Sequence, residues 1–330
     1  MPNMDFEWQI EEFMVDCRSR QLRPKTMNSY EQALRLFARW CRERMNITEV
    51  TDVTEGVVRR YINDLQERGK YTVCADDRAL EKNFTDRRRD FRKPVSTVTI
   101  NCYLRDIRVF FNWLDRDYLL SKNPMKKIKQ LKTNRKAKDY ISDEEFKRLI
   151  NILDKSYYPE HRDFAMITLM IDSGMRLGEC SVLLVSDISL TKRHIKLRAE
   201  TTKGRKDRVV YFSAKTEMIL RRWIQYKDRY LESDYLFPAK YSGTPIQVSN
   251  FEVNFKNYLR RAGLNETSSP HCLRNNFAKR CLMSGMDIYT LSKILGHSSV
   301  TVTEEAYLDL TEEDIGKRYQ SFSPMAHMRN

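Results

Sequence analysis

The sequence predicts a mainly α protein in two parts: an N-terminal helical bundle, and a C-terminal α+β domain with a small antiparallel sheet. Two observations predict this fold class. Apolar residues recur at helical spacing through most of the chain, and three short runs of β-forming residues lie close together between residues 188 and 212. The chain has 330 residues, of which 41% are hydrophobic, enough for two separate cores.

Four helices are expected in the first domain, residues 1–125, because apolar residues recur on one face of each. They are residues 5–18, residues 26–44, residues 54–68 and a helix that follows Ser96. Between the third and the fourth lies a polar insertion, residues 71–94, which is longer than most connections in a compact domain. It is either a basic arm with a binding role or a solvated loop. Its consecutive basic residues are Arg87, Arg88 and Arg89.

A basic linker is expected at residues 126–139, and residues 126–138 include no acidic side chain. Charges of one sign repel each other, so this segment should be extended when no partner is bound. The side chains that we expect to bind an anionic partner are Lys126, Lys127, Lys129, Lys132, Arg135 and Lys136.

The second domain is expected at residues 140–330 and should begin with a helix, because Ser142 and Glu145 form a capping box. A nearly continuous apolar run predicts a buried helix at residues 164–173. The three strands of the sheet are expected at residues 188–190, 194–197 and 209–212. Further helices are expected at residues 214–230 and 249–262, after Ser269, from Asp287 to a C-terminal cap at Gly296, and from Thr311 into a polar tail.

The chain is strongly basic, with 59 Lys and Arg against 45 Asp and Glu and a formal net charge of +14. Such a charge first indicates a nucleic-acid-binding protein, and otherwise a soluble basic protein with no such partner. Seven cysteines without a C-x-x-C pair favour a reduced, cytoplasmic compartment, where the protein would associate with the nucleoid. No signal peptide or membrane-spanning run is expected.

Two short motifs near the C-terminus suggest a phosphate site. His271 and Arg274 lie three residues apart, so they share a helix face. His297 follows the glycine that ends the next helix, and Tyr307 comes ten residues later. Arg274 and the two histidines could bind one phosphodiester while Tyr307 approaches it. Each residue alone has an ordinary structural explanation, but the combination is rare. No metal site is expected, because the Cys and His residues lack the usual ligand spacing.

These motifs resemble those of the tyrosine recombinase (phage integrase) family. Residues 173–179, Ser-Gly-Met-Arg-Leu-Gly-Glu, resemble the family's first arginine motif, with Arg176 as the catalytic arginine. Glu179 would orient Arg176 or His271. Residues 202–208 resemble the family's β-hairpin lysine motif, with Lys203 as the catalytic lysine. The remaining positions match at His271, Arg274, His297 and the nucleophile Tyr307, although the last two are ten positions apart here and nine positions apart in many members.

The resemblance implies a SAM-like core-binding domain, a catalytic domain and strand exchange through a 3′-phosphotyrosyl intermediate and a Holliday junction, without a cofactor. Lys203 would be the general acid, and Arg205 beside it would bind DNA. The implied partners are double-stranded recombination sites, a homo-tetramer on two such sites and, in some systems, DNA-bending accessory proteins. The insertion and the His–Tyr spacing favour a mobile-element integrase or transposase. The alternatives are a Xer-like chromosome or plasmid resolvase, a type IB-like topoisomerase and a non-catalytic DNA-binding accessory protein.

Overall fold

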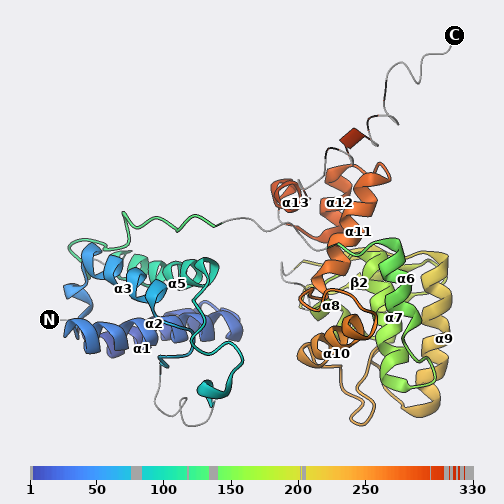
Figure 1. The fold of residues 1–330 in the computed structure, drawn as a ribbon, viewed down its shortest axis with the longest axis horizontal. Helices are drawn as coiled ribbons and strands as arrows, with labels where there is room; N and C mark the ends of the chain where they lie inside the picture. The colour runs from blue at the N-terminus through green and yellow to red at the C-terminus, as the bar shows by residue number, and fades with distance from the viewer. Residues whose placement is uncertain are drawn as a thin grey trace. The chain divides into compact units, whose positions relative to one another are not determined.

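The protein forms two compact units, residues 1–135 and residues 136–330. The computed structural model describes residues 3–75, 84–116, 119–133, 140–200, 202, 206–297 and 299–307, and the single residues 312, 315, 316, 319 and 323. Helices dominate both units, and one small sheet lies in the second (Figure 1). The predicted fold class is therefore confirmed. No helix in the described part of the chain is long and apolar enough to cross a membrane.

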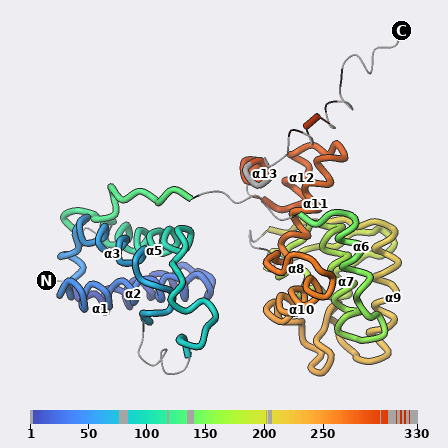
Figure 2. The backbone as a smooth tube through the Cα atoms, viewed as in Figure 1, coloured from blue at the N-terminus to red at the C-terminus, as the bar shows by residue number. Residues whose placement is uncertain are grey.

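The N-terminal unit is a helical bundle whose four long helices are those expected from the sequence. They are α1 (Phe6–Ser19), α2 (Pro24–Met45), α3 (Glu55–Glu67) and α5 (Thr97–Arg116). The side chains of Asp5 and Thr54 cap α1 and α3. Helix α2 contacts the other three helices of the bundle (Figure 2). The apolar faces of the four helices meet in a core rich in aromatic rings.

The insertion at residues 71–94 leaves and re-enters the bundle at one place. Gly69 pairs with Pro94 in an isolated β-bridge. The backbone N–H of Arg92 donates to the Lys70 carbonyl, and that of Lys70 donates to the Lys93 carbonyl. A side chain at Gly69 would have no room, because its Cβ would lie 2.4 Å from Arg92 Cα. The base of the insertion is thus a closed stem. The exposed residues beyond it include Arg87, Arg88 and Arg89.

The first half of the expected linker packs against the bundle, which differs from the extended segment that its charge predicts. Ile128 is buried in the N-terminal core. The side-chain amide of Asn101 donates to the Leu131 carbonyl and accepts from the Leu131 N–H, both at 2.9 Å. Arg108 donates to the Ile128 carbonyl at 2.7 Å. These contacts offset the charge repulsion. The exposed basic side chains in the described part of this segment are Lys126, Lys127, Lys129 and Lys132.

The C-terminal unit begins with α6, whose capping box between Ser142 and Glu145 is the one predicted. Helix α6 spans Asp143–Asn151. It is followed by α7 (Tyr158–Ser173), α8 (Leu177–Ser181), α9 (Ala214–Tyr230) and α10 (Val248–Arg261). Helix α7 begins earlier than predicted, because the charged pair in its first half is buried and satisfied. Arg162 donates to Asp163, which also accepts from Asn254 and Tyr258.

A three-stranded antiparallel sheet and three C-terminal helices complete this unit. The strands are β1 (Ile188–Ser189), β2 (His194–Leu197) and β3 (Arg208–Tyr211), in the order β1-β2-β3. The helices are α11 (His271–Met283), α12 (Ile288–Leu295) and α13 (Val300–Tyr307). Helix α11 packs on the buried helix α7, and α12 contacts α11, α13 and β3. The helix expected after Thr311 lies largely outside the described residues.

Candidate active site

Arg176 lies in a sharp turn between α7 and α8. Gly174 ends α7 with a left-handed φ of 66°, and a Cβ there would lie 2.3 Å from the Phe277 ring. After this turn, Arg176 occupies the N-cap position of α8. Its backbone N–H donates to Glu179 Oε2 at 2.9 Å, and its Nη1 donates to Glu179 Oε1 at 3.0 Å. Glu179 therefore fixes both the backbone and the side chain of Arg176.

Arg274 is almost completely buried, with 1% of its surface exposed. Its Nη1 donates to the Gly174 carbonyl and its Nη2 to the Leu295 carbonyl, both at 2.7 Å. A buried guanidinium is costly unless its N–H groups find acceptors. Here the acceptors are backbone oxygens at the ends of α7 and α12, so the fold itself orients this side chain.

His297 is placed by the end of α12 and by α13. Gly296 caps α12 in the left-handed conformation. His297 Nε2 lies 2.9 Å from Arg274 Nη2, and its Nδ1 lies 2.7 Å from the hydroxyl of Thr303. Because a guanidinium can only donate, Nε2 must accept, and the ring proton of a neutral His297 is then on Nδ1, donating to Thr303. Thr303 is fully buried, so it orients the ring.

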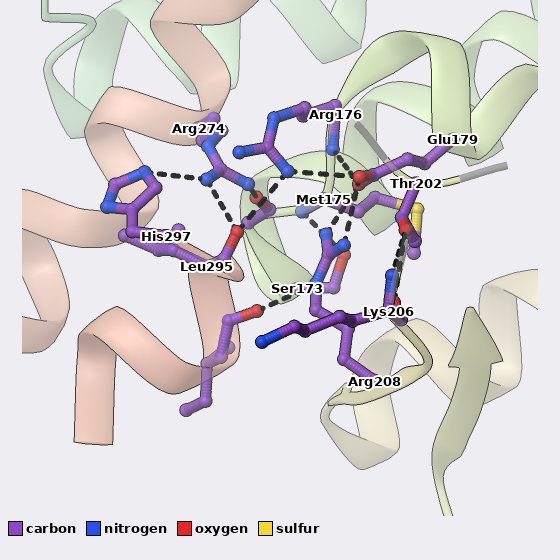
Figure 3. A network of polar contacts seen from close by, with 12 residues as sticks. Ser173, Met175, Arg176, Glu179, Thr202, Lys206, Arg208, Arg274, Leu295 and His297 are labelled. Carbon is purple, nitrogen blue, oxygen red and sulfur yellow. Dashed lines mark hydrogen bonds and ion pairs between the residues drawn. The ribbon is translucent and has the colours of Figure 1, made fainter. Parts of the chain in front are cut away.

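The Glu179 carboxylate is shared by two arginines from different elements. Besides Arg176, it accepts from Arg208 of β3, with Nη1 at 2.9 Å and Nη2 at 2.5 Å (Figure 3). Burial alone would raise the pKa of Glu179. The hydrogen bonds and charges of Arg208 and Arg176 outweigh this effect and hold its pKa below the usual value. Glu179 is therefore an anion at neutral pH, locked between two cations.

The two candidate catalytic arginines converge on one oxygen atom. Arg176 Nη1 lies 3.5 Å and Arg274 Nη2 lies 2.7 Å from the Leu295 carbonyl oxygen. Figure 3 shows Arg274 between His297 and Arg176, with the three side chains side by side. His271 is exposed at the start of α11, and it lines a pocket of about 180 Å³ together with Arg274. The structure thus brings together four of the residues singled out from the sequence.

Other expected site residues are described only in part. Lys203, Arg205, Arg135 and Lys136 lie outside the described residues. Tyr307 is the last residue of α13, and only its backbone is described. On either side of residues 203–205, Thr202 and Lys206 are joined directly. The buried Thr202 hydroxyl accepts from the Lys206 N–H at 3.2 Å and donates to the Lys206 carbonyl at 3.0 Å.

Two residues of the site were not singled out from the sequence, Arg208 and Thr303. Arg208 lies two residues before Val210, which is fully buried in β3. Since side chains two apart share one face of a strand, Arg208 also points inward and requires a buried acceptor. That signal was readable in the sequence. Thr303 gives no local signal, because its partner His297 is brought to it by the turn between α12 and α13.

Two family models match the chain. The phage integrase family matches residues 139–314, and the phage integrase N-terminal SAM-like domain matches residues 10–117. A tyrosine recombinase of Thermosipho africanus is 29% identical over 217 residues, which are 66% of this chain and 73% of the relative. Tyrosine recombinase XerD of Oceanobacillus iheyensis is 26% identical over 326 residues, 97% of this chain and 99% of the relative.

Solved structures share the fold as well. The Tn1549 transposon integrase, in complex with a circular intermediate DNA, aligns with a TM-score of 0.72 and 17% sequence identity. The alignment covers 97% of this chain and 100% of that chain. At this identity the likeness concerns the fold alone.

Proposed function

The chain belongs to the phage integrase family, and we propose that it is a site-specific recombinase whose Tyr307 attacks a DNA phosphodiester bound by Arg176, Arg274 and His297. As a tyrosine recombinase it is an enzyme that cleaves and rejoins DNA strands. We propose in addition the individual steps of the reaction, the residues that perform them and the biological role.

The convergence of two guanidinium groups on one oxygen carries this proposal. Arg176 and Arg274 donate to the same carbonyl oxygen, that of Leu295. A phosphodiester presents two non-bridging oxygens with a shared negative charge, and a planar guanidinium fork suits such an anion. Cations fixed before the substrate arrives stabilise the charge that develops at phosphorus without further reorganisation. Their positions therefore fit phosphoryl transfer better than simple DNA binding.

In the proposed reaction the Tyr307 oxygen forms a bond to phosphorus, and the bond from phosphorus to the 5′ oxygen breaks. His271 takes the phenol proton or bonds the phosphate, and Lys203 gives a proton to the departing 5′ oxygen. The products are a 3′-phosphotyrosyl link and a free 5′ hydroxyl, and a 5′ hydroxyl of another strand reverses the step. His297 Nε2 accepts from Arg274 in the free protein, so donation to a phosphate oxygen requires a proton there.

We propose that basic residues outside the site bind the DNA backbone. Each neutralised phosphate releases counterions, so such contacts add affinity on any sequence. The partner would be double-stranded recombination sites, bound by a homo-tetramer that exchanges strands through a Holliday junction in the nucleoid, with or without DNA-bending accessory proteins. The residues assigned to this role are Lys126, Lys127, Lys129, Lys132, Arg135, Lys136, Arg205, Arg87, Arg88 and Arg89.

For the biological role we propose integration or excision of a mobile element, which the insertion at residues 71–94 favours. The end-to-end match with a XerD protein, over 97% of this chain, supports the second candidate, a chromosome or plasmid resolvase. Sequencing the DNA around the gene distinguishes them. Inverted repeats at the ends of an element that includes the gene would support integration, and a site used near the replication terminus would support the resolvase.

A nicked candidate site tests the chemistry, because loss of a short strand traps the covalent intermediate. The wild-type protein should form an adduct that survives denaturation, and Tyr307→Phe should bind the same DNA without forming it. An adduct in Tyr307→Phe would shift the nucleophile elsewhere, first to Tyr319.

The general acid is tested with sulfur in place of the bridging 5′ oxygen. The defect of Lys203→Ala should shrink on this substrate, because a thiolate leaves without a proton.

A further inference from the structure

Arg208 lies in β3, where this strand meets α8 and α12, and three of its nitrogens donate hydrogen bonds to these two helices. Two of its nitrogens donate to the two oxygens of Glu179, and Nε donates to the Ile294 carbonyl at 3.2 Å. Only 11% of its side chain is exposed. The charge of Arg208 is thus already paired with a carboxylate, which distinguishes it from Arg274, whose nitrogens donate to neutral backbone carbonyls. The contacts of Arg208 connect β3 with α8 and with the last turn of α12.

The backbone at the end of α12 rests directly on the Arg208 side chain. A Cβ added at Gly296 would lie 2.8 Å from Arg208 Cδ and 2.9 Å from its Nε. Ile294 and Gly296 flank Leu295, whose carbonyl accepts from both Arg176 and Arg274. The residue after Gly296 is His297. The Arg208 side chain therefore supports the backbone that carries the Leu295 carbonyl oxygen, on which Arg176 and Arg274 converge.

We propose that Arg208 is a positioning residue for the phosphate site. It orients Arg176 through the shared Glu179 carboxylate, and it fixes the turn that carries the Leu295 carbonyl and His297. The inference rests on the proposed function of Arg176 and His297 as phosphate ligands. Without Arg208, Glu179 would keep only the contacts from Arg176 among those described here, and the end of α12 would lose a hydrogen bond and a packing surface.

A purely structural role would look different in experiment. Removing one partner of a buried ion pair destabilises a protein, because the other charge is left buried without it. In Arg208→Met the Glu179 carboxylate keeps its two hydrogen bonds from Arg176, so the variant should be less stable than wild type but still folded at the assay temperature, which thermal unfolding checks. Arg208→Lys keeps the charge but cannot contact both carboxylate oxygens and the Ile294 carbonyl at once. Arg198→Met is a matched control, because Arg198 pairs with Asp187 near the same sheet.

The first measurement is single-turnover cleavage of a nicked site, with DNA affinity and thermal unfolding of the same variants. Arg208→Met should cleave about 100-fold more slowly, since a displacement of about 1 Å at a reacting centre has that effect. Its DNA affinity should stay within about threefold of wild type, because phosphate contacts outside the site dominate binding. Arg208→Lys should recover part of the rate, and Arg198→Met should cleave like wild type. Cleavage by Arg208→Met at the wild-type rate would overturn the proposal.

The second measurement uses a methyl group in place of one non-bridging oxygen of the scissile phosphate. Less charge then has to be stabilised at phosphorus, so the deficit of Arg208→Met relative to wild type should shrink. A loss of folded protein would lower cleavage of both substrates equally, and that result would also overturn the proposal. If wild type forms no adduct at all, the proposed function itself fails, and that failure is distinguishable from a wild-type adduct with an unaffected Arg208→Met.

Discussion

The basic residues of the candidate active site differ from the lysines of residues 126–132 in which part of the residue is held by hydrogen bonds. In the site the side chains themselves are bonded, as with Arg274, whose nitrogens donate to two backbone carbonyls. In residues 126–132 the backbone is bonded, through Asn101 and Arg108, while the lysine side chains stay exposed.

This difference suggests a division of labour. A reaction at one phosphorus atom gains from donors whose positions are set in advance. Affinity for a polyanion needs only that charges lie along its path, and mobile ammonium groups can adapt to many phosphates. The backbone contacts of residues 126–132 still matter, because they hold the segment that carries the four lysines against the bundle. Four changes, from the largest expected effect to the smallest, test this comparison.

Arg274→Ala should have the largest effect, because it removes a fixed charge and the hydrogen bonds that the Gly174 and Leu295 carbonyls accept from it. Loss of one such preorganised donor lowers a rate by about 100- to 1000-fold, and an unsatisfied buried polar group costs about 1–3 kcal/mol. Single-turnover cleavage and urea unfolding measure the two losses separately. Normal stability with no cleavage would show that the Gly174 and Leu295 contacts do not support the fold.

Replacing the four exposed lysines with glutamine should weaken binding without a comparable effect on the chemical step. Each lost phosphate contact should reduce the slope of log affinity against log salt by roughly one unit, on specific and unrelated DNA alike. Titrations at several salt concentrations give the slope, and cleavage at saturating protein gives the rate. An unchanged slope would mean that these side chains are only solvated. The variant positions are Lys126, Lys127, Lys129 and Lys132.

Asn101→Ala should have a smaller effect of the same kind. It removes both hydrogen bonds to Leu131 while leaving every lysine in place. The segment then pays an ordering cost on binding, so affinity should fall by about tenfold or less, in line with about 1 kcal/mol per backbone residue fixed. The salt slope should stay at the wild-type value, since the number of contacts is the same. A reduced slope would show that the anchoring also decides which lysines reach the DNA.

Glu179→Gln should change the pH dependence of the free energy of unfolding, and this is the smallest of the four expected effects. The pKa of Glu179 is lowered in the folded protein from its ordinary value of 4.5. Its carboxylate therefore stabilises the fold fully above that pH, and this contribution is lost as pH falls through the folded pKa. The difference in unfolding free energy between wild type and Glu179→Gln should be largest at neutral pH and shrink below pH 4.5. A difference that is constant with pH would exclude a charge-based role.

The fold was largely predictable because its signals are local. Helix periodicity, the capping box at Ser142 and the glycine that ends α12 each lie within a few residues of the structure that they specify. The small antiparallel sheet also followed from three β-forming runs that lie close together in the sequence. The early start of α7 was missed because Arg162 and Asp163 have their partners far away in the sequence.

The sequence predicts the site as a set of residues, but not its internal contacts. Arg274 and His297 stand out through residue type and spacing, and Arg176 through the resemblance of residues 173–179 to the family's first arginine motif. The acceptors of Arg274 are backbone oxygens, which any sequence supplies, so no pattern points to them. The packing of residues 126–131 on the bundle was hidden for a similar reason, since Asn101 contacts Leu131 across 30 positions of the chain.

The two carbonyls bonded to Arg274 also have an electrostatic consequence. They lie at the carboxyl ends of α7 and α12, and the macrodipole of a helix places roughly half a negative elementary charge at that end. Two such ends together balance about one guanidinium charge. The site should therefore attract free phosphate or sulfate only weakly, in spite of its arginines. Selectivity for a phosphodiester would then depend on basic residues outside the site, such as the exposed lysines of residues 126–132, and the site would act on the DNA that they bind.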